Sequence, residues 1–136
     1  MDGAVRRRLL DTHGETIEAV IDSGQTVARA LPQEDVSESA AVSRPLNALI
    51  GKRKLRGELL AMLHTGAAAI DESVAGTPVP APPYLVVTSV GPVCRATLSD
   101  GRRLVVTVRL FDVDRRPVRY RFADPDAETC LDVRIR

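Results

Sequence analysis

Apolar residues in the first part of the chain recur at the spacing of a helix. From Asp2 to Leu31 they stand three or four positions apart, or a sum of these, and Pro32 ends the pattern. The members of this stripe are Val5, Leu9, Ile17, Val20, Val27 and Leu31. Gly14 and Gly24 each cost about 1 kcal/mol relative to alanine inside a helix. The pattern therefore predicts a helix over 2–31 and allows a break near either glycine.

A second helical pattern follows a polar and acidic stretch. Residues 33–43 have no clear period and predict a loop, with Ser43 as the N-cap of the next helix and Pro45 in its first turn. From there to about Ser73, apolar residues again project to one side of a helix. They are Leu46, Leu49, Leu60, Leu63, Ala67, Ile70 and Val74.

Three apolar residues of this segment, Ile50, Leu55 and Met62, lie off its main stripe. Their positions fit either two helices hinged at Gly51 or one helix that is buried over a wide arc. We expect some of this apolar surface to be left over for a partner.

A proline-rich connector follows the helices. Four prolines lie between Pro78 and Pro83, so the segment is extended and poor in backbone donors. It is too short to separate two independent domains. We therefore expect a single domain over 1–136, with a helical half over 1–74, the connector over 75–83 and a sheet half over 84–136.

Apolar and polar residues alternate through the sheet half, as is typical of strands with one buried face. Ser99, Asp100 and Gly101 form the clearest hairpin turn. The predicted strands are 84–89, 92–98, 103–113, 118–123 and 129–135. Short strands joined by short turns favour an antiparallel meander. The predicted fold class is α+β, with two N-terminal helices, or three, packed on one face of a C-terminal antiparallel meander of four to five strands.

One face of this sheet is expected to pack on the helices, where each buried Val or Leu contributes roughly 1.5–3 kcal/mol. Its members are Leu104, Val106, Val108, Leu110, Val118, Tyr120, Phe122, Leu131, Val133 and Ile135.

The opposite face is rich in arginine and also carries Asp132 and Arg136. Its candidate anion-binding residues are Arg95, Arg109, Arg119, Arg121 and Arg134. The planar guanidinium group makes paired hydrogen bonds to phosphate and carboxylate, which suits a platform for RNA, DNA or an acidic protein segment. The alternative is a solvated face that Asp112, Glu128 and Asp132 balance. Platforms for single strands usually present aromatic side chains, whereas alternation turns Tyr120 and Phe122 to the other face.

A second basic cluster consists of Lys52, Arg53, Lys54 and Arg56. A short helix, a turn at Gly51 and a longer helix resemble helix-turn-helix geometry, which would place this cluster near DNA. However, residues 59–69 are too apolar for a helix exposed in a groove, and five strands exceed what a wing needs. The alternative is a solvated charged turn.

The charge of the chain is nearly balanced, with a net charge of +1 from 19 basic and 18 acidic residues. The helical half carries a net charge of −2 and residues 91–136 a net charge of +3. All basic residues except Lys52 and Lys54 are arginine, which indicates the GC-rich genome of a prokaryote.

We expect a cytoplasmic protein with no membrane segment, because no apolar run approaches the roughly 18 residues that span a bilayer. An apolar signal region is also missing after Arg6, Arg7 and Arg8. The two cysteines, Cys94 and Cys130, are 36 positions apart in sequence. This spacing fits free thiols in a reducing compartment.

Residues that could carry chemistry do not form a catalytic pattern. His13 and His64 are far apart in sequence, and there is no GxSxG, HExxH or phosphate-binding glycine loop. The acidic pairs, at residues 112 and 114 and at residues 124 and 126, lie at predicted strand ends, where Asp commonly caps turns. The sequence thus predicts no enzyme, no catalytic residue, no cofactor and no metal site.

The sequence does not define a specific activity. The first hypothesis is a small non-enzymatic interaction or assembly module that self-associates or binds a protein partner. The alternative is a nucleic-acid-binding regulator that uses the arginine-rich sheet face or the basic cluster over 52–56.

Overall fold

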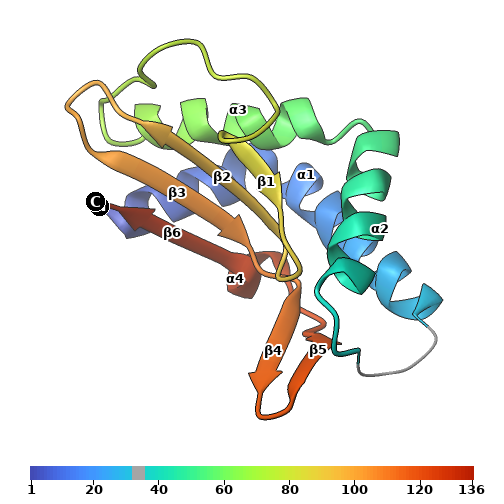
Figure 1. Cartoon of the computed structure of the whole chain (residues 1–136). Helices are drawn as coiled ribbons and strands as arrows, with labels where there is room; N and C mark the ends of the chain where they lie inside the picture. The colour runs from blue at the N-terminus through green and yellow to red at the C-terminus, as the bar shows by residue number, and fades with distance from the viewer. Residues whose placement is uncertain (32–35) are drawn as a thin grey trace.

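The computed structural model describes residues 1–31 and 36–136 and confirms an α+β fold, with helices first and an antiparallel sheet after them (Figure 1). The helices are α1 (Asp2–Ala30), α2 (Ala40–Lys52), α3 (Arg56–Ala68) and the short α4 (Ala127–Cys130). The strands are β1 (Leu85–Val87), β2 (Pro92–Thr97), β3 (Arg103–Val108), β4 (Phe111–Arg115), β5 (Val118–Phe122) and β6 (Leu131–Ile135). None of the helices in these ranges is long and apolar enough to cross a bilayer.

Helix α1 buries the stripe that its sequence predicts, with only Leu31, beyond its last residue, partly exposed. Its regular backbone is interrupted at His13 (φ −119°, ψ 23°), next to Gly14, where a break was expected. Gly24 continues the helix instead. A Cβ at Gly24 would lie 3.0 Å from Leu110 Cδ1, so this glycine allows the chain after β3 to pack closely on α1.

The second helical pattern is two helices, α2 and α3, but the hinge is not at Gly51. It lies at residues 53–55, where Lys54 adopts a positive φ of 60°. The chain turns there, so the apolar residues on either side of the turn reach the same core from different directions. Ile50, Leu55 and Met62 are 0%, 8% and 0% exposed, so the expectation that they are left over for a partner is wrong.

The start of α2 also differs from the prediction. The helix begins at Ala40, so Ser43 is not its N-cap and Pro45 lies inside it. The fully buried Val42 explains this extension, because its contact with the core adds a turn that the polar composition of the segment hides. Of the predicted loop over 33–43, residues 33–35 lie outside the described residues.

The main sheet has the order β1-β2-β3-β6, and all its pairs are antiparallel. The predicted strand over 103–113 is broken, since consecutive Leu110 and Phe111 are both buried and cannot alternate between two faces. Both residues donate backbone hydrogen bonds to Val90 O, at 2.8 and 3.0 Å. The chain then leaves the sheet as the separate β4–β5 hairpin, and β6 returns to pair with β3.

The side chains of the hairpin therefore do not extend the buried face of the sheet as predicted. Val118 is 41% exposed, and Tyr120 and Phe122 are only partly buried. The last strand is also shorter than expected, because Thr129 belongs to α4. There the Asp126 side chain caps the helix by accepting the Thr129 N–H at 2.8 Å.

Helices α1 and α3 cover one face of the main sheet, and in the described ranges no helix covers the other face (Figure 1). The strand residues that point to the helices are Leu85, Cys94, Ala96, Leu104, Val106, Val108, Leu131 and Val133. The uncovered side is the open face on which the candidate site lies.

Candidate functional site

The open face is formed by the outward-pointing residues of the main sheet, in three rows that cross the strands. The first row is Val86, Val93, Thr107 and Asp132. The second is Tyr84, Arg95, Val105 and Arg134. The third is Thr97, Arg103 and Arg136. Neighbouring strands lie about 4.8 Å apart, so the Cα atoms of two arginines in the same row are within about 10 Å of each other across the sheet.

The charge of these rows is strongly one-sided. Four arginines stand against Asp132, the one acidic residue in the three rows. Arg109 follows β3 as another exposed arginine, but it lies outside these rows in a hollow that Asp112 and Asp114 also line. Two arginines have described partners. Arg134 Nε lies 3.4 Å from Asp132 Oδ2, and Arg95 Nε donates to Pro83 O at 2.9 Å.

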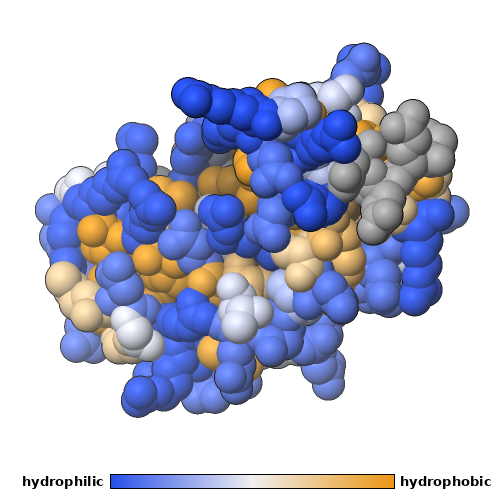
Figure 2. All heavy atoms as spheres, turned by 90° about the horizontal axis from the view of Figure 1, so that it is seen from below, coloured by the Kyte–Doolittle hydropathy of each residue, from blue (hydrophilic) through white to orange (hydrophobic). Residues whose placement is uncertain are grey.

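The floor between the arginines is apolar. Val86, Val93 and Val105 point outward yet are only partly exposed, which is expected where the aliphatic stems of long arginine side chains lie over them. Figure 2 shows the molecule from below, a side other than the open face, where apolar atoms also gather between hydrophilic side chains.

A hollow of about 440 Å³ lies at one end of the open face. Its lining comes from the end of the connector and from β2 and β3: Pro83, Tyr84, Arg95, Ala96, Thr97 and Arg103. Its size lies within the ~300–1,000 Å³ of small-molecule sites. The hollow brings one aromatic ring and two arginines to the same place.

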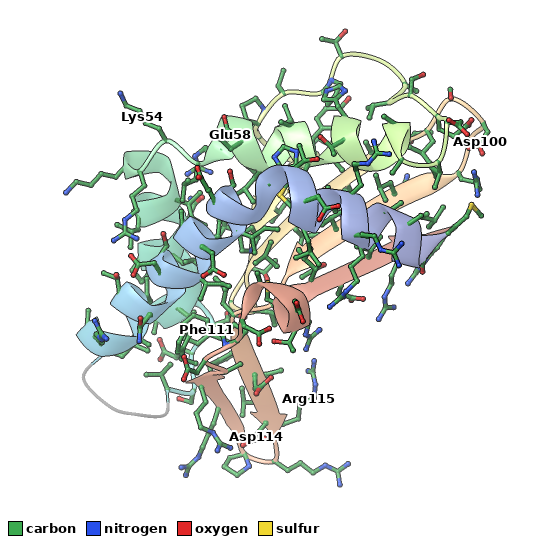
Figure 3. The ribbon with its side chains drawn as sticks, turned by 180° about the vertical axis from the view of Figure 1, so that it is seen from behind. Lys54, Glu58, Asp100, Phe111, Asp114 and Arg115 are labelled. Carbon is green, nitrogen blue, oxygen red and sulfur yellow. The ribbon has the colours of Figure 1, made fainter. Side chains whose placement is uncertain are left out.

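The structure places the five predicted arginines of the sheet in two groups. Arg95 and Arg134 belong to the open face, whereas Arg109 shares a hollow with residues of the separate hairpin, and Arg119 and Arg121 lie on β5 of that hairpin. Arg121 pairs with Asp114, which stands well out along the hairpin beside Arg115, while Phe111 lies at its root (Figure 3).

Three residues of the open face were missed as site residues: Tyr84, Arg103 and Arg136. The alternation contains the signal for both arginines, since Arg103 is in step with Val105 and Arg136 with Arg134. Tyr84 precedes β1 and is assigned to this face by the hydrogen bond from Arg95 N to its carbonyl, at 2.9 Å.

The basic cluster over 52–56 lies at the hinge between α2 and α3, where two of its members have structural partners. Arg53 Nη1 donates to Asp22 Oδ2 at 2.9 Å and to Ser23 Oγ at 3.0 Å, which ties the hinge to α1. Arg56 Nη2 donates to Asn47 O at 2.9 Å. Lys52 and Lys54 are exposed. The structure does not bring this cluster onto the open face.

Three titratable side chains of the described residues are buried: His13, Cys94 and Cys130. His13 Nε2 lies 2.7 Å from Thr65 Oγ1, and burial lowers the pKa of His13 while the Glu58 carboxylate acts in the opposite direction. Burial raises the pKa of Cys94 to about 12 and that of Cys130 to about 11, and both are free thiols. Among the described residues, no three His, Cys, Asp or Glu side chains are grouped closely enough to hold a metal ion.

The chain belongs to the family described as a domain of unknown function, DUF7988, whose model matches residues 3–136. No curated protein and no solved structure matches the chain. The family covers both the helical and the sheet half, and it assigns no activity to the open face.

Proposed function

We propose that this protein is a non-enzymatic binding module whose open face binds nucleic acid. One observation carries the proposal: four arginines, at positions 95, 103, 134 and 136, gather on a face with one described acidic residue, Asp132, in a chain whose net charge is only +1. The planar guanidinium groups suit phosphate oxygens, and a cluster of them attracts a polyanion over several ångströms.

The arrangement of the arginines supports a partner that is itself anionic. Arg103 and Arg136 are directly opposite each other across β3 and β6, and like charges at such positions are destabilising. A protein that retains this arrangement gains from an anion that neutralises both groups. Phosphate contacts of this kind position a nucleic acid without reading its sequence.

Self-association is the other hypothesis from the sequence. Its main support was apolar surface of α2 and α3 left over for a partner, but these apolar residues are used in the core. Self-association stays a prediction, and a measurement of the oligomeric state in solution tests it. The two buried free thiols support a reducing compartment, and we propose a cytoplasmic protein of a prokaryote with a GC-rich genome.

The test measures binding of a labelled mixed DNA and RNA pool by fluorescence anisotropy at two salt concentrations. The variant R103Q/R136Q removes two arginines from the open face. The matched control R115Q/R116Q removes two exposed arginines from the tip of the β4–β5 hairpin. We expect binding that weakens with salt, a clear loss in the first variant and nearly unchanged binding in the control. No binding at low salt, or an equal loss in both variants, would overturn the proposal.

A further inference from the structure

The hollow at the end of the open face contains the only aromatic side chain in the three rows. Tyr84 is partly buried there, beside Arg95 and Thr97, and Arg103 completes the lining. The other aromatic residues, Phe111, Tyr120 and Phe122, belong to the separate hairpin. A ring next to two arginines is the combination with which proteins hold a base and its phosphates.

The backbone of Tyr84 is fixed on both sides. Its N–H donates to Ala81 O at 3.0 Å, and its carbonyl accepts the N–H of Arg95 at 2.9 Å. Pro82 and Pro83, which precede it, restrict the chain further. The carbonyl of Pro83 also accepts from Arg95 Nε, so the ring and the guanidinium group are held by the same short segment. The site therefore needs little ordering when a ligand binds.

We infer that the open face binds single-stranded nucleic acid, with one base stacked on Tyr84 in the hollow and the phosphates over Arg95, Arg103 and Arg136. The inference rests on the proposed function and names the form of nucleic acid. The apolar floor favours a single strand over a duplex. A single strand can lay base faces on Val86, Val93 and Val105, whereas a duplex keeps its base faces stacked inside and offers mainly phosphates and sugars to a sheet.

The test compares three probes on the full chain: a labelled single strand of about 12 nucleotides, within the ~4–16 that one such domain covers, the duplex of the same sequence, and inorganic polyphosphate as competitor. We expect the single strand to bind at least about fivefold more tightly than the duplex. Tyr84→Ala should remove at least about fivefold of single-strand affinity, and Tyr84→Phe should retain it, because stacking needs the ring and not the hydroxyl group.

The outcomes separate this inference from the proposed function. If neither nucleic acid binds, the proposed function fails and the inference with it. Three results would show that the open face binds phosphate alone: the duplex binds as tightly as the single strand, polyphosphate displaces both equally well, or folded Tyr84→Ala binds normally. Each of these results overturns the inference and leaves the proposed function standing. Circular dichroism and the melting temperature establish that each variant is folded.

Discussion

Arg103 and Arg136 exchange both backbone hydrogen bonds, at 2.7 and 2.9 Å, and so lie directly opposite each other with their side chains on the open face. Facing cross-strand pairs contribute roughly 0.2–1 kcal/mol to a sheet, and like charges act against it. This pair therefore lowers the stability of the free protein.

The first prediction follows from that pair. Replacing one of its members, as in Arg136→Thr, should raise the free energy of unfolding by roughly 0.2–1 kcal/mol at low salt. The gain should shrink as salt is added, because the repulsion between exposed groups is screened. Urea unfolding at two salt concentrations measures both effects. A loss of stability at low salt would show that Arg136 holds the sheet together rather than opposing it.

A second prediction concerns Gly91, which meets the backbone of Val108. A Cβ at Gly91 would lie 1.8 Å from Val108 O, and the φ of +153° is one that L residues rarely adopt. Gly91→Ala should therefore destabilise the protein by about 3 kcal/mol or more, since strain and overpacking add.

The matched control for Gly91 is Gly57→Ala in α3. A Cβ at Gly57 would have no neighbour within 4 Å, so alanine should stabilise the helix by about 0.5–1 kcal/mol. Thermal unfolding of the two variants should move in opposite directions. If Gly91→Ala melts like the unmodified protein, the close approach of Gly91 to Val108 is absent in solution.

The third prediction is an acid sensitivity located at His13. Burial lowers the pKa of His13 in the folded protein below its ordinary value of 6.5, so the unfolded chain binds the extra proton more readily. The contribution of the neutral ring to the free energy of unfolding is therefore fully present above about pH 6.5 and is lost as the pH falls below that value. Glu58 weakens this effect because its carboxylate favours the charged ring.

Two variants test the assignment to His13. His13→Gln should flatten the pH dependence of the free energy of unfolding between about pH 5 and 7, and Glu58→Gln should steepen it. Urea midpoints across that range provide the measurement. An unchanged profile in His13→Gln would assign the acid sensitivity to other groups.

The fourth prediction is that both cysteines are unreactive in the native protein. The thiolate is the reactive form, and the raised pKa values of about 12 for Cys94 and about 11 for Cys130 keep both thiols protonated at pH 8. Ellman's reagent should detect almost no thiol in the folded chain and two after denaturation in guanidinium. Rapid labelling of either residue in the folded state would contradict the packing around it.

Much of the fold could be predicted because apolar residues recur along the chain at the spacing of a helix or of a strand. The stripe of α1 and the alternation of β2 and β3 each follow from burial of one face. The hinge at Lys54 could not be predicted, because a positive φ in lysine depends on the packing of the two helices that meet there.

The exit of the chain from the sheet after Val108 was hidden for a similar reason. Leu110 and Phe111 read as part of a long strand until the tertiary contacts with Val90 and Gly24 are known. Pairing of β6 with β3 spans the whole hairpin, and no local pattern specifies it.

The candidate site was predicted in part. Alternation placed Arg95, Arg134 and Arg136 correctly on one face, although Arg136 was not named as a candidate, and the same reasoning applied to Arg103 would have added it. Alternation alone also assigns Arg119 and Arg121 to that face, because no local pattern shows that the hairpin leaves the main sheet. Tyr84 could not be found, since its place depends on how the connector joins β1.

The most direct test of the central claim is a map of the binding surface by nuclear magnetic resonance. The Nε–H signals of the arginine side chains are followed while a single-stranded oligonucleotide is added to the isotope-labelled protein. We predict that Arg95, Arg103, Arg134 and Arg136 shift together and in a salt-dependent way, while Arg115 and Arg116 at the hairpin tip stay in place. Shifts confined to the hairpin tip or to residues 52–56, or no shifts at low salt, would contradict the assignment of the open face as the binding surface.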